Sequence, residues 1–289
     1  MGYLHISNLY KDTTILLFKE CYALEKIHGT SAHISWKHDE NKISFFSGGE
    51  KHERFITLFD EEQLKTKFKE LFDMDVTIFG EAYGGRLQGM RETYGDNLKF
   101  IVFDVKVEYF WVDVPGAEDI ANKMGLEFVP YVKCITDLEE LNCQRDYRSI
   151  VAERNGIKEM KIREGIVVRP LIELTKNSGD RIIAKHKRDE FRETKTKQEV
   201  NPESLKILED ANKIAEEWVT PMRLSHILDK LGNPTEIEKI PIVIKAMFED
   251  IKREGEGEIV MTKAVGTSIG RITANLYKNK ISKIKGGKQ

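Results

Sequence analysis

The sequence predicts an α+β fold class: a sheet-rich domain with flanking helices, followed by a small all-helical domain. Up to about residue 187, short stretches of alternating apolar and polar residues are separated by polar turns, as in half-buried strands. From Asn201 onward, apolar residues recur at the three- and four-residue spacing of helices. The charged stretch 188–200 separates the two patterns, so we expect domains at 1–195 and 201–289.

The elements of the first domain follow from these periodicities. Alternation predicts a hairpin with strands at 32–37 and 43–47, and helical spacing of leucines and phenylalanines predicts a helix over 61–72. Short apolar runs predict the remaining strands, and longer periodic segments predict the remaining helices. Further strands are expected at 22–25, 76–79, 100–107, 165–169 and 181–186, and further helices at 117–124 and 137–154.

The second domain is predicted from helical spacing alone. A helical pattern starts at Leu205 and continues to Leu231, where Gly232-Asn233-Pro234 is a clear stop signal. Further helices fit residues 236–253 and 258–281.

Composition excludes several classes of protein. The net charge of −2 argues against a general nucleic-acid coating protein. The sequence has no run of 18 apolar residues and no charged-then-apolar leader, so we expect neither a membrane span nor a secretion signal. The three cysteines form no CxxC pair, so they imply neither zinc nor a disulfide framework, and we expect a reducing cytoplasm. Residues 271–289 hold six basic side chains and no acidic one, a tail that suits either phosphate contact or solubility.

Five short motifs carry the chemical signal, and they occur in a fixed order along the first domain. A lone Lys-x-x-Gly is a weak signal, because such a match arises readily by chance. Five motifs in order, each on a predicted strand or strand end, are far more specific. The motifs are Glu25-Lys26-Ile27-His28-Gly29-Thr30, Phe79-Gly80-Glu81, Phe103-Asp104, Glu164 to Pro170, and Lys185-His186-Lys187.

These residue types suit the transfer of an adenylyl group through a covalent lysine intermediate. A lysine amine such as that of Lys26 attacks only in its neutral form, so it needs surroundings that favour loss of the proton. Lys185 and Lys187 are two apart on a strand and point the same way, so both can line one face of a phosphate site. Glu164 supplies a carboxylate of the kind that binds the magnesium accompanying ATP.

On these motifs the chain resembles the RNA ligase 2 family, within the covalent nucleotidyltransferase superfamily of ligases and capping enzymes. The resemblance extends to Val219-Thr220, Arg223 and Lys230-Leu231-Gly232, which are similar to the start of that family's helical C-terminal domain. It implies a nucleotidyltransferase (ATP-grasp-like ligase) domain of antiparallel sheets, with a helical domain that binds nucleic-acid ends.

The resemblance also implies a role for each motif residue. Lys26 would be the nucleophile, Lys185 and Lys187 would hold the α-phosphate, and Glu164 would be the metal-side carboxylate. Glu81 would accept from the ribose hydroxyl. The remaining implied site residues are Phe103 as the adenine stack (with plain core as the alternative), Glu25 and Ile27 at the base, Ser31 and Arg169 as weaker nucleotide contacts, and Asp104 as an orienting residue. The implied cofactors are ATP as AMP donor and Mg²⁺, with Mn²⁺ as a substitute.

The chain departs from the family pattern at one place. The family usually has an arginine in the strand after the first hairpin, where it contacts the nucleotide or a 5′-phosphate. Here that place reads Ser47-Gly48-Gly49, and the nearest basic residues are Lys51 and Arg54. Either the amides of the glycine turn or Arg54 could take this role. His28 and His186 lie inside motifs and are interpreted as packing or hydrogen-bonding residues.

The implied activity is ATP-dependent RNA ligation of 3′-hydroxyl and 5′-phosphate ends, by way of a lysyl-adenylate and an adenylylated 5′ end. The expected substrates are nicks in duplex RNA or RNA/DNA hybrids, and the expected state is a monomer in a bacterial or phage-infected cell. An ATP-dependent DNA ligase remains an alternative, although the helical pattern over 201–289 replaces the β-barrel expected there. The same helical pattern disfavours a capping guanylyltransferase, and the full motif set disfavours a catalytically dead relative that only binds nucleic acid.

Overall fold

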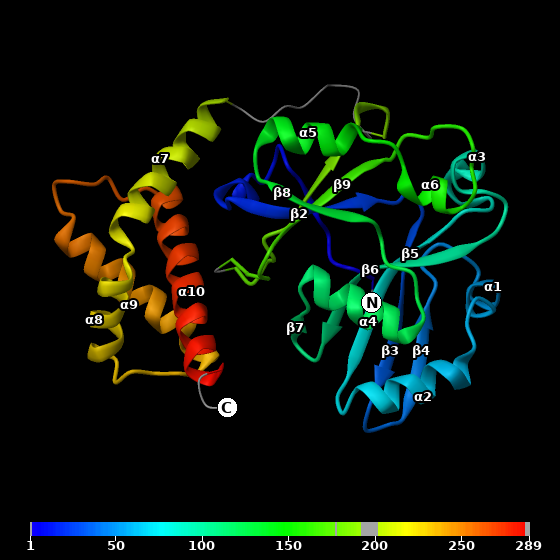
Figure 1. Ribbon diagram of the computed structural model, residues 1–289, viewed down its shortest axis with the longest axis horizontal. Coiled ribbons are helices and arrows are strands. Elements are labelled where there is room, and N and C mark those ends of the chain that lie inside the picture. The colour runs from blue at the N-terminus through cyan, green and yellow to red at the C-terminus, as the bar shows by residue number, and fades with distance from the viewer. Residues whose placement is uncertain (1, 177, 192–201, 287–289) are drawn as a thin grey trace. The chain divides into compact units, whose positions relative to one another are not determined.

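The computed structural model describes residues 2–176, 178–191 and 202–286. Contacts divide the chain into two compact units, Met1–Glu199 and Val200–Gln289 (Figure 1). Most of the linker predicted at 188–200 lies outside the described residues. Within the described ranges, no helix is both long and apolar enough to span a bilayer.

The first unit contains two five-stranded sheets, of which sheet A holds the strands that carry the lysine motifs. In sheet A, β1 pairs in parallel with β10, whereas the other neighbours are antiparallel. The sequence predicted neither β1 nor β8, and β8 carries the partly exposed thiol of Cys134, 3.7 Å from that of Cys21 in β2. The order of the strands is β1 (Ser7–Asn8), β10 (Ala184–Lys187), β9 (Gly165–Pro170), β2 (Glu20–Lys26) and β8 (Tyr131–Ile135).

Sheet B is antiparallel throughout and is built from strands that follow one another closely in the chain. The predicted alternation is confirmed, since Ala32, Ile34 and Trp36 are buried on one face of β3. That face forms the main core of the unit with helices α2 (Glu61–Leu71) and α4 (Val114–Met124). Trp36 stacks on Phe68 of α2 at 5.7 Å between ring centroids. The order is β4 (Lys42–Phe46), β3 (Thr30–Lys37), β5 (Val76–Tyr83), β6 (Lys99–Val107) and β7 (Phe110–Trp111).

Short helices surround the two sheets, and α5 lies along sheet A (Figure 1). The single helix predicted over 137–154 is two helices, because Tyr147 has an extended backbone and Ser149 caps a new helix by accepting from the amide of Ala152. The helices are η1 (Thr14–Leu17), α1 (His52–Ile56), α2 (Glu61–Leu71), η2 (Leu87–Gly89), α3 (Arg91–Tyr94), α4 (Val114–Met124), α5 (Leu138–Asp146), α6 (Ile150–Arg154) and η3 (Asp189–Phe191).

The described part of the second unit is helical, around a separate apolar core that includes Leu224, Met247 and Tyr277. Helix α8 starts at Thr220, whose hydroxyl accepts from the amide of Arg223, and it is followed by Gly232 and Asn233 with positive φ. The elements are α7 (Pro202–Trp218), α8 (Pro221–Lys230), η4 (Ile237–Lys239), α9 (Ile240–Glu254) and α10 (Lys263–Gly286).

Candidate active site

Three strands of sheet A bring Lys26 and Lys187 to the same face. Lys26 is opposite Gly165 of β9, and Gly165 is opposite Lys187 of β10. Directly opposed residues point to one face of a sheet, so both lysines project together with no side chain between them. Only glycine fits at position 165, because the φ of Gly165 is +152° and an added Cβ would lie 2.2 Å from the carbonyl oxygen of His186.

Glu164 precedes that glycine and joins the two lysines through its carboxylate, which is 1% exposed. Its Oε2 lies 3.0 Å from Nζ of Lys26 and 3.1 Å from Nδ1 of His28, and its Oε1 lies 2.8 Å from Nζ of Lys187. Burial alone would raise the pKa of Glu164, but the hydrogen bond from His28 and the charges of the two lysines lower it to about 2. The carboxylate is therefore ionised near neutral pH and holds the Lys26 amine in place.

Glu81 of β5 lies close to this cluster, and its pKa is shifted in the opposite direction from that of Glu164. Its Oε1 accepts a hydrogen bond from the amide of Gly29 at 3.2 Å. Burial and the nearby charge of Glu164 raise the pKa of Glu81 to about 7, although Lys26 opposes the rise. Near neutral pH this carboxyl is therefore divided between its protonated and ionised forms. The approach of Gly29 to β5 is tight, because a Cβ there would lie 2.2 Å from the carbonyl oxygen of Ala82.

A β-bulge positions Phe103. Phe79 of β5 is opposite Asp104 of β6, whereas the next residue, Gly80, is opposite Val102. Phe103 is therefore the extra residue of the bulge, which is a device that re-aims side chains and often lies beside active sites. Asp104 is fully buried and Phe103 is partly exposed at the edge of the core.

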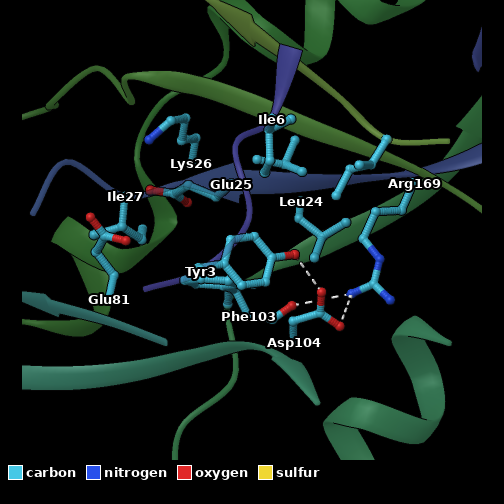
Figure 2. A pocket seen from close by; sticks show the side chains of 13 residues that line it. Tyr3, Ile6, Leu24, Glu25, Lys26, Ile27, Glu81, Phe103, Asp104 and Arg169 are labelled. Carbon is cyan, nitrogen blue, oxygen red and sulfur yellow. Dashed lines mark hydrogen bonds and ion pairs between the residues drawn. The ribbon is translucent and has the colours of Figure 1, made fainter. Parts of the chain in front are cut away.

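A cavity of about 520 Å³, including its opening, adjoins these residues (Figure 2). Both sheets and the N-terminal residues Tyr3 and Ile6 contribute to its walls. The walls are mainly apolar away from Lys26, Glu25 and Glu81. Of the residues singled out from the sequence, Glu25, Lys26, Ile27, Glu81, Phe103, Asp104 and Arg169 line the cavity. The other lining residues are Tyr3, Ile6, Leu24, Val129, Val167 and Ile183.

Beneath Phe103, Asp104 forms the centre of a buried charge network. Its carboxylate lies 3.0 Å from NH1 of Arg169 and 2.5 Å from NH1 of Arg181. Both guanidinium groups also bind the carboxylate of Glu173, at 2.5 and 2.7 Å. Arg169 further donates to the carbonyl oxygen of Phe103 at 3.2 Å. Asp104 therefore holds Arg169 and Arg181 in place, and Arg169 supports the cavity wall. The orienting role expected of Asp104 stays a prediction.

Glu25 is held by residues that the sequence did not single out. Its carboxylate accepts hydrogen bonds from the hydroxyl of Ser149 at 2.5 Å and from the amide of Ile150 at 2.9 Å. Arg163 lies 3.7 Å away. Burial raises the pKa of Glu25, and these partners only partly offset the rise. The N-terminus of α6 therefore fixes Glu25 in the cavity wall.

Four predicted site residues do not line the cavity. Glu164 and Lys187 lie in the cluster with Lys26, and the other two are Ser31 and Lys185. Ser31 is opposite Glu81 in the β3–β5 ladder, and its buried Oγ has no hydrogen-bond partner among the described residues. Lys185 is opposite Val167 in β10, two residues before Lys187, so both lysines point the same way as predicted.

The glycine turn Ser47-Gly48-Gly49 packs against β3. The amide of Gly49 donates to Oγ1 of Thr30 at 2.8 Å, and Gly48 has φ of +59° with Ser31 directly behind it. That amide is therefore already used within the protein. Arg54 forms an ion pair with Glu50 at 3.5 Å, and its side chain is about half exposed.

The sequence did not reveal the site contacts of His28 and Tyr3. His28 was interpreted as a packing or hydrogen-bonding residue without a named partner, and its ring contacts the same carboxylate oxygen as Lys26. The sequence signal for this contact was the position of His28, two residues after Lys26 and just past the end of β2. Tyr3 belongs to no motif, and nothing in the sequence marked it.

The donor set bears on metal binding. Within the described ranges, no group of three or more His, Cys, Asp or Glu side chains could hold a metal ion. Glu164 offers carboxylate oxygens of the kind that a hard divalent cation prefers. The residues therefore fit an ion that takes one protein carboxylate and completes its shell with phosphate oxygens and water.

Comparison with known proteins identifies the family. A family model described as RNA ligase matches residues 19–187. Among solved structures, a mutant of Naegleria gruberi RNA ligase with ATP and Mn aligns with a TM-score of 0.51 at 14% identity. A second mutant with AMP and Mn, and the same ligase with PPi, each align with a TM-score of 0.50 at 14% identity. Each alignment covers 66% of this chain and 57% of the other, so the chain spans less than two thirds of their length.

The structural likeness confirms the α+β fold of antiparallel sheets and helices as an RNA ligase fold. A search of the curated proteins found no match to the sequence. The family model covers more than half of the chain and includes the five motifs, from Lys26 to Lys187. The chain therefore belongs to the RNA ligase family.

Proposed function

We propose that the protein is an ATP-dependent RNA ligase that joins 3′-hydroxyl and 5′-phosphate ends. The observation that carries the proposal is the cluster of Lys26 and Lys187 on the ionised carboxylate of Glu164, at the edge of a cavity lined by Phe103. A lysine nucleophile, a second cation and an aromatic platform are the groups that a lysyl-adenylate pathway needs. The solved structures of the fold relatives with ATP and with AMP support an adenine nucleotide as the ligand.

In the first step, the neutral amine of Lys26 attacks the α-phosphorus of ATP. The new P–N bond forms as the bond to the bridging oxygen breaks, pyrophosphate leaves, and the attacking nitrogen gives up one proton to solvent. Glu164 positions the amine, while Lys187 and Lys185 neutralise charge on the phosphate. A divalent cation at Glu164 would supply further neutralisation of the phosphate oxygens.

The adenylylated lysine then gives up its AMP. An oxygen of the RNA 5′-phosphate attacks the same phosphorus, the P–N bond breaks, and the Lys26 amine regains its proton. In the third step, the 3′-hydroxyl oxygen attacks the activated 5′-phosphorus and loses its proton, and AMP leaves. The helical second unit and its basic end, residues 271–289, are proposed to hold RNA in these two steps.

The first test is incubation with α-labelled ATP and magnesium, after pyrophosphate treatment has removed bound adenylate. Wild type should retain label covalently, and Lys26→Ala should retain none. Lys26→Arg is the matched control, because it keeps the positive charge beside Glu164 but has no attacking amine. A folded wild type that takes up no label would contradict the proposal.

The second test is a panel of nicked substrates. RNA–RNA, RNA–DNA hybrid and DNA–DNA nicks with identical sequences separate an RNA ligase from a DNA ligase by their sealing rates. We expect sealing of the RNA–RNA nick and of the RNA-containing hybrid nicks. Sealing of the all-DNA nick at the highest rate would favour the DNA ligase instead, and labelling by GTP rather than ATP would favour a capping enzyme.

A further inference from the structure

The N-terminal segment contributes to the cavity, although it lies outside the region matched by the family model. Tyr3 and Ile6 both line the cavity, whereas the match begins at residue 19. Figure 2 shows the Tyr3 ring beside Phe103, with its hydroxyl directed at Asp104 and Ile6 above it. The family pattern therefore leaves this part of the wall unassigned.

Ring contacts join Tyr3 to the aromatic platform. Its ring meets Phe103 edge-to-face, with centroids 4.8 Å apart and planes at 79°. It also contacts Phe79 at 5.1 Å and Trp111 at 5.7 Å, both near the bulge. Because Phe103 is the extra residue of the bulge, regular cross-strand pairing does not fix its direction. The edge-to-face contact with the Tyr3 ring therefore restricts the movement of Phe103.

Polar contacts fix Tyr3 in turn. Its hydroxyl donates to Oδ2 of Asp104 at 2.5 Å and accepts from NH1 of Arg181 at 3.0 Å. Burial and the charge of Asp104 raise the pKa of Tyr3 well above its ordinary value, so the hydroxyl remains a donor at physiological pH. The guanidinium of Arg181 also lies over the ring of Trp111, 4.0 Å from its centroid.

The segment is anchored at its other end beside the lysine strand. Asn8 of β1 is opposite Lys185 of β10, and the amide of Leu9 donates to the carbonyl oxygen of Lys185 at 2.9 Å. The segment thus runs from the aromatic side of the cavity at Tyr3 to the strand that carries Lys185 and Lys187.

We propose that residues 3–8 form a wall of the nucleotide cavity, with Tyr3 as a positioning residue that holds Phe103 for stacking on the base. The ligand class is an adenine nucleotide, so the inference rests on the proposed function for the identity of the base. Loss of the Tyr3 ring should weaken nucleotide binding and leave the chemistry of Lys26 intact, because Tyr3 is not among the groups that contact the Lys26 amine.

The test compares Tyr3→Leu and Tyr3→Phe with wild type in two assays: AMP binding by calorimetry, and self-adenylylation with α-labelled ATP. For Tyr3→Leu we expect the AMP Kd and the KM for ATP to rise about tenfold, with the rate at saturating ATP within about twofold of wild type. Tyr3→Phe keeps the ring and should stay within about threefold in both. Tyr10→Leu is the matched control, because Tyr10 follows the segment two residues after Asn8 and does not line the cavity, and it should match wild type.

Unchanged or tighter AMP binding by Tyr3→Leu would overturn the inference, as would an equal effect of Tyr10→Leu. If Tyr3→Leu does not fold, Tyr3→Met keeps a long apolar side chain without a ring, and the same expectations apply to it. Calorimetry needs no covalent chemistry. A wild type that binds AMP but forms no lysyl-adenylate would therefore refute the ligase proposal, and the AMP affinities of the Tyr3 variants would still test the role of Tyr3. A wild type that binds no AMP would overturn the inference, and covalent labelling with ATP would still decide the ligase proposal separately.

Discussion

Replacing Glu164 by Gln keeps the shape of the side chain and removes the negative charge that Lys26, His28 and Lys187 share. The structure gives the size of the effect. The pKa of Glu164 is lowered from an ordinary 4.5 to about 2, although burial acts in the opposite direction. That difference corresponds to about 3 kcal/mol by which the folded protein favours the ionised carboxylate. Gln resembles the neutral form, so Glu164→Gln should lower the free energy of unfolding by about 3 kcal/mol at pH 7.

The effect has a definite pH dependence. A carboxylate with a lowered pKa stabilises the fold above its unfolded value of 4.5, and this stabilisation is lost as the pH falls through about 2. The difference between wild type and Glu164→Gln should therefore shrink to about half or less by pH 3. The assay is denaturant unfolding of both proteins at a series of pH values, without nucleotide and with a metal chelator.

Glu81→Gln is a matched control with the opposite sign, because the pKa of Glu81 is raised to about 7. Its protonated form stabilises the fold below pH 4.5, and that stabilisation is lost as the pH rises through about 7. At pH 8 Glu81→Gln should therefore be more stable than wild type. The electrostatic reasoning is refuted if Glu164→Gln costs less than about 1 kcal/mol at pH 7, or if both variants shift stability in the same direction.

Other predictions follow from particular contacts. Phe103→Ala should raise the KM for ATP about tenfold, and Phe103→Trp should restore it if the ring acts by stacking; a normal KM in Phe103→Ala would assign the ring to the core alone. Gly165→Ala should lower the free energy of unfolding by about 2 kcal/mol or more, because its Cβ would lie 2.2 Å from a backbone oxygen. A variant whose free energy of unfolding in denaturant equals that of wild type would contradict this. Deleting residues 201–289 should spare self-adenylylation more than sealing of 5′-phosphate ends in step-resolved assays, and equal loss of both in a folded truncation would count against it.

Local patterns were sufficient to predict much of the fold. The hairpin that follows Lys26 was visible because its alternation has a period of two over several residues. Strand β8 was missed because Val132 and Ile135 are exposed at a sheet edge, so no alternation marks it. The two-residue strand β1 is too short to have a pattern at all.

The candidate site divides in the same way. Lys26, Glu164 and Lys187 were found because each belongs to a motif, and pairing of their strands brings them together. Tyr3 was missed because its partners are remote in sequence: its hydroxyl reaches Asp104 across 101 residues and Arg181 across 178. A bulge that displaces Phe103 likewise depends on the register between two strands, which one strand's sequence does not reveal.

The positions in the chain of the strands that form each sheet affect how the protein folds during synthesis. Sheet B is made from strands that are consecutive in the chain, β3 to β7, so its hairpins can close as soon as they leave the ribosome. Sheet A needs strands from both ends of the unit, and its β1–β10 ladder joins Ser7 to Ala184. The two sheets line the cavity together, so we expect a nascent chain to hold a folded sheet B, and to gain the ability to bind nucleotide only after residue 187 has emerged.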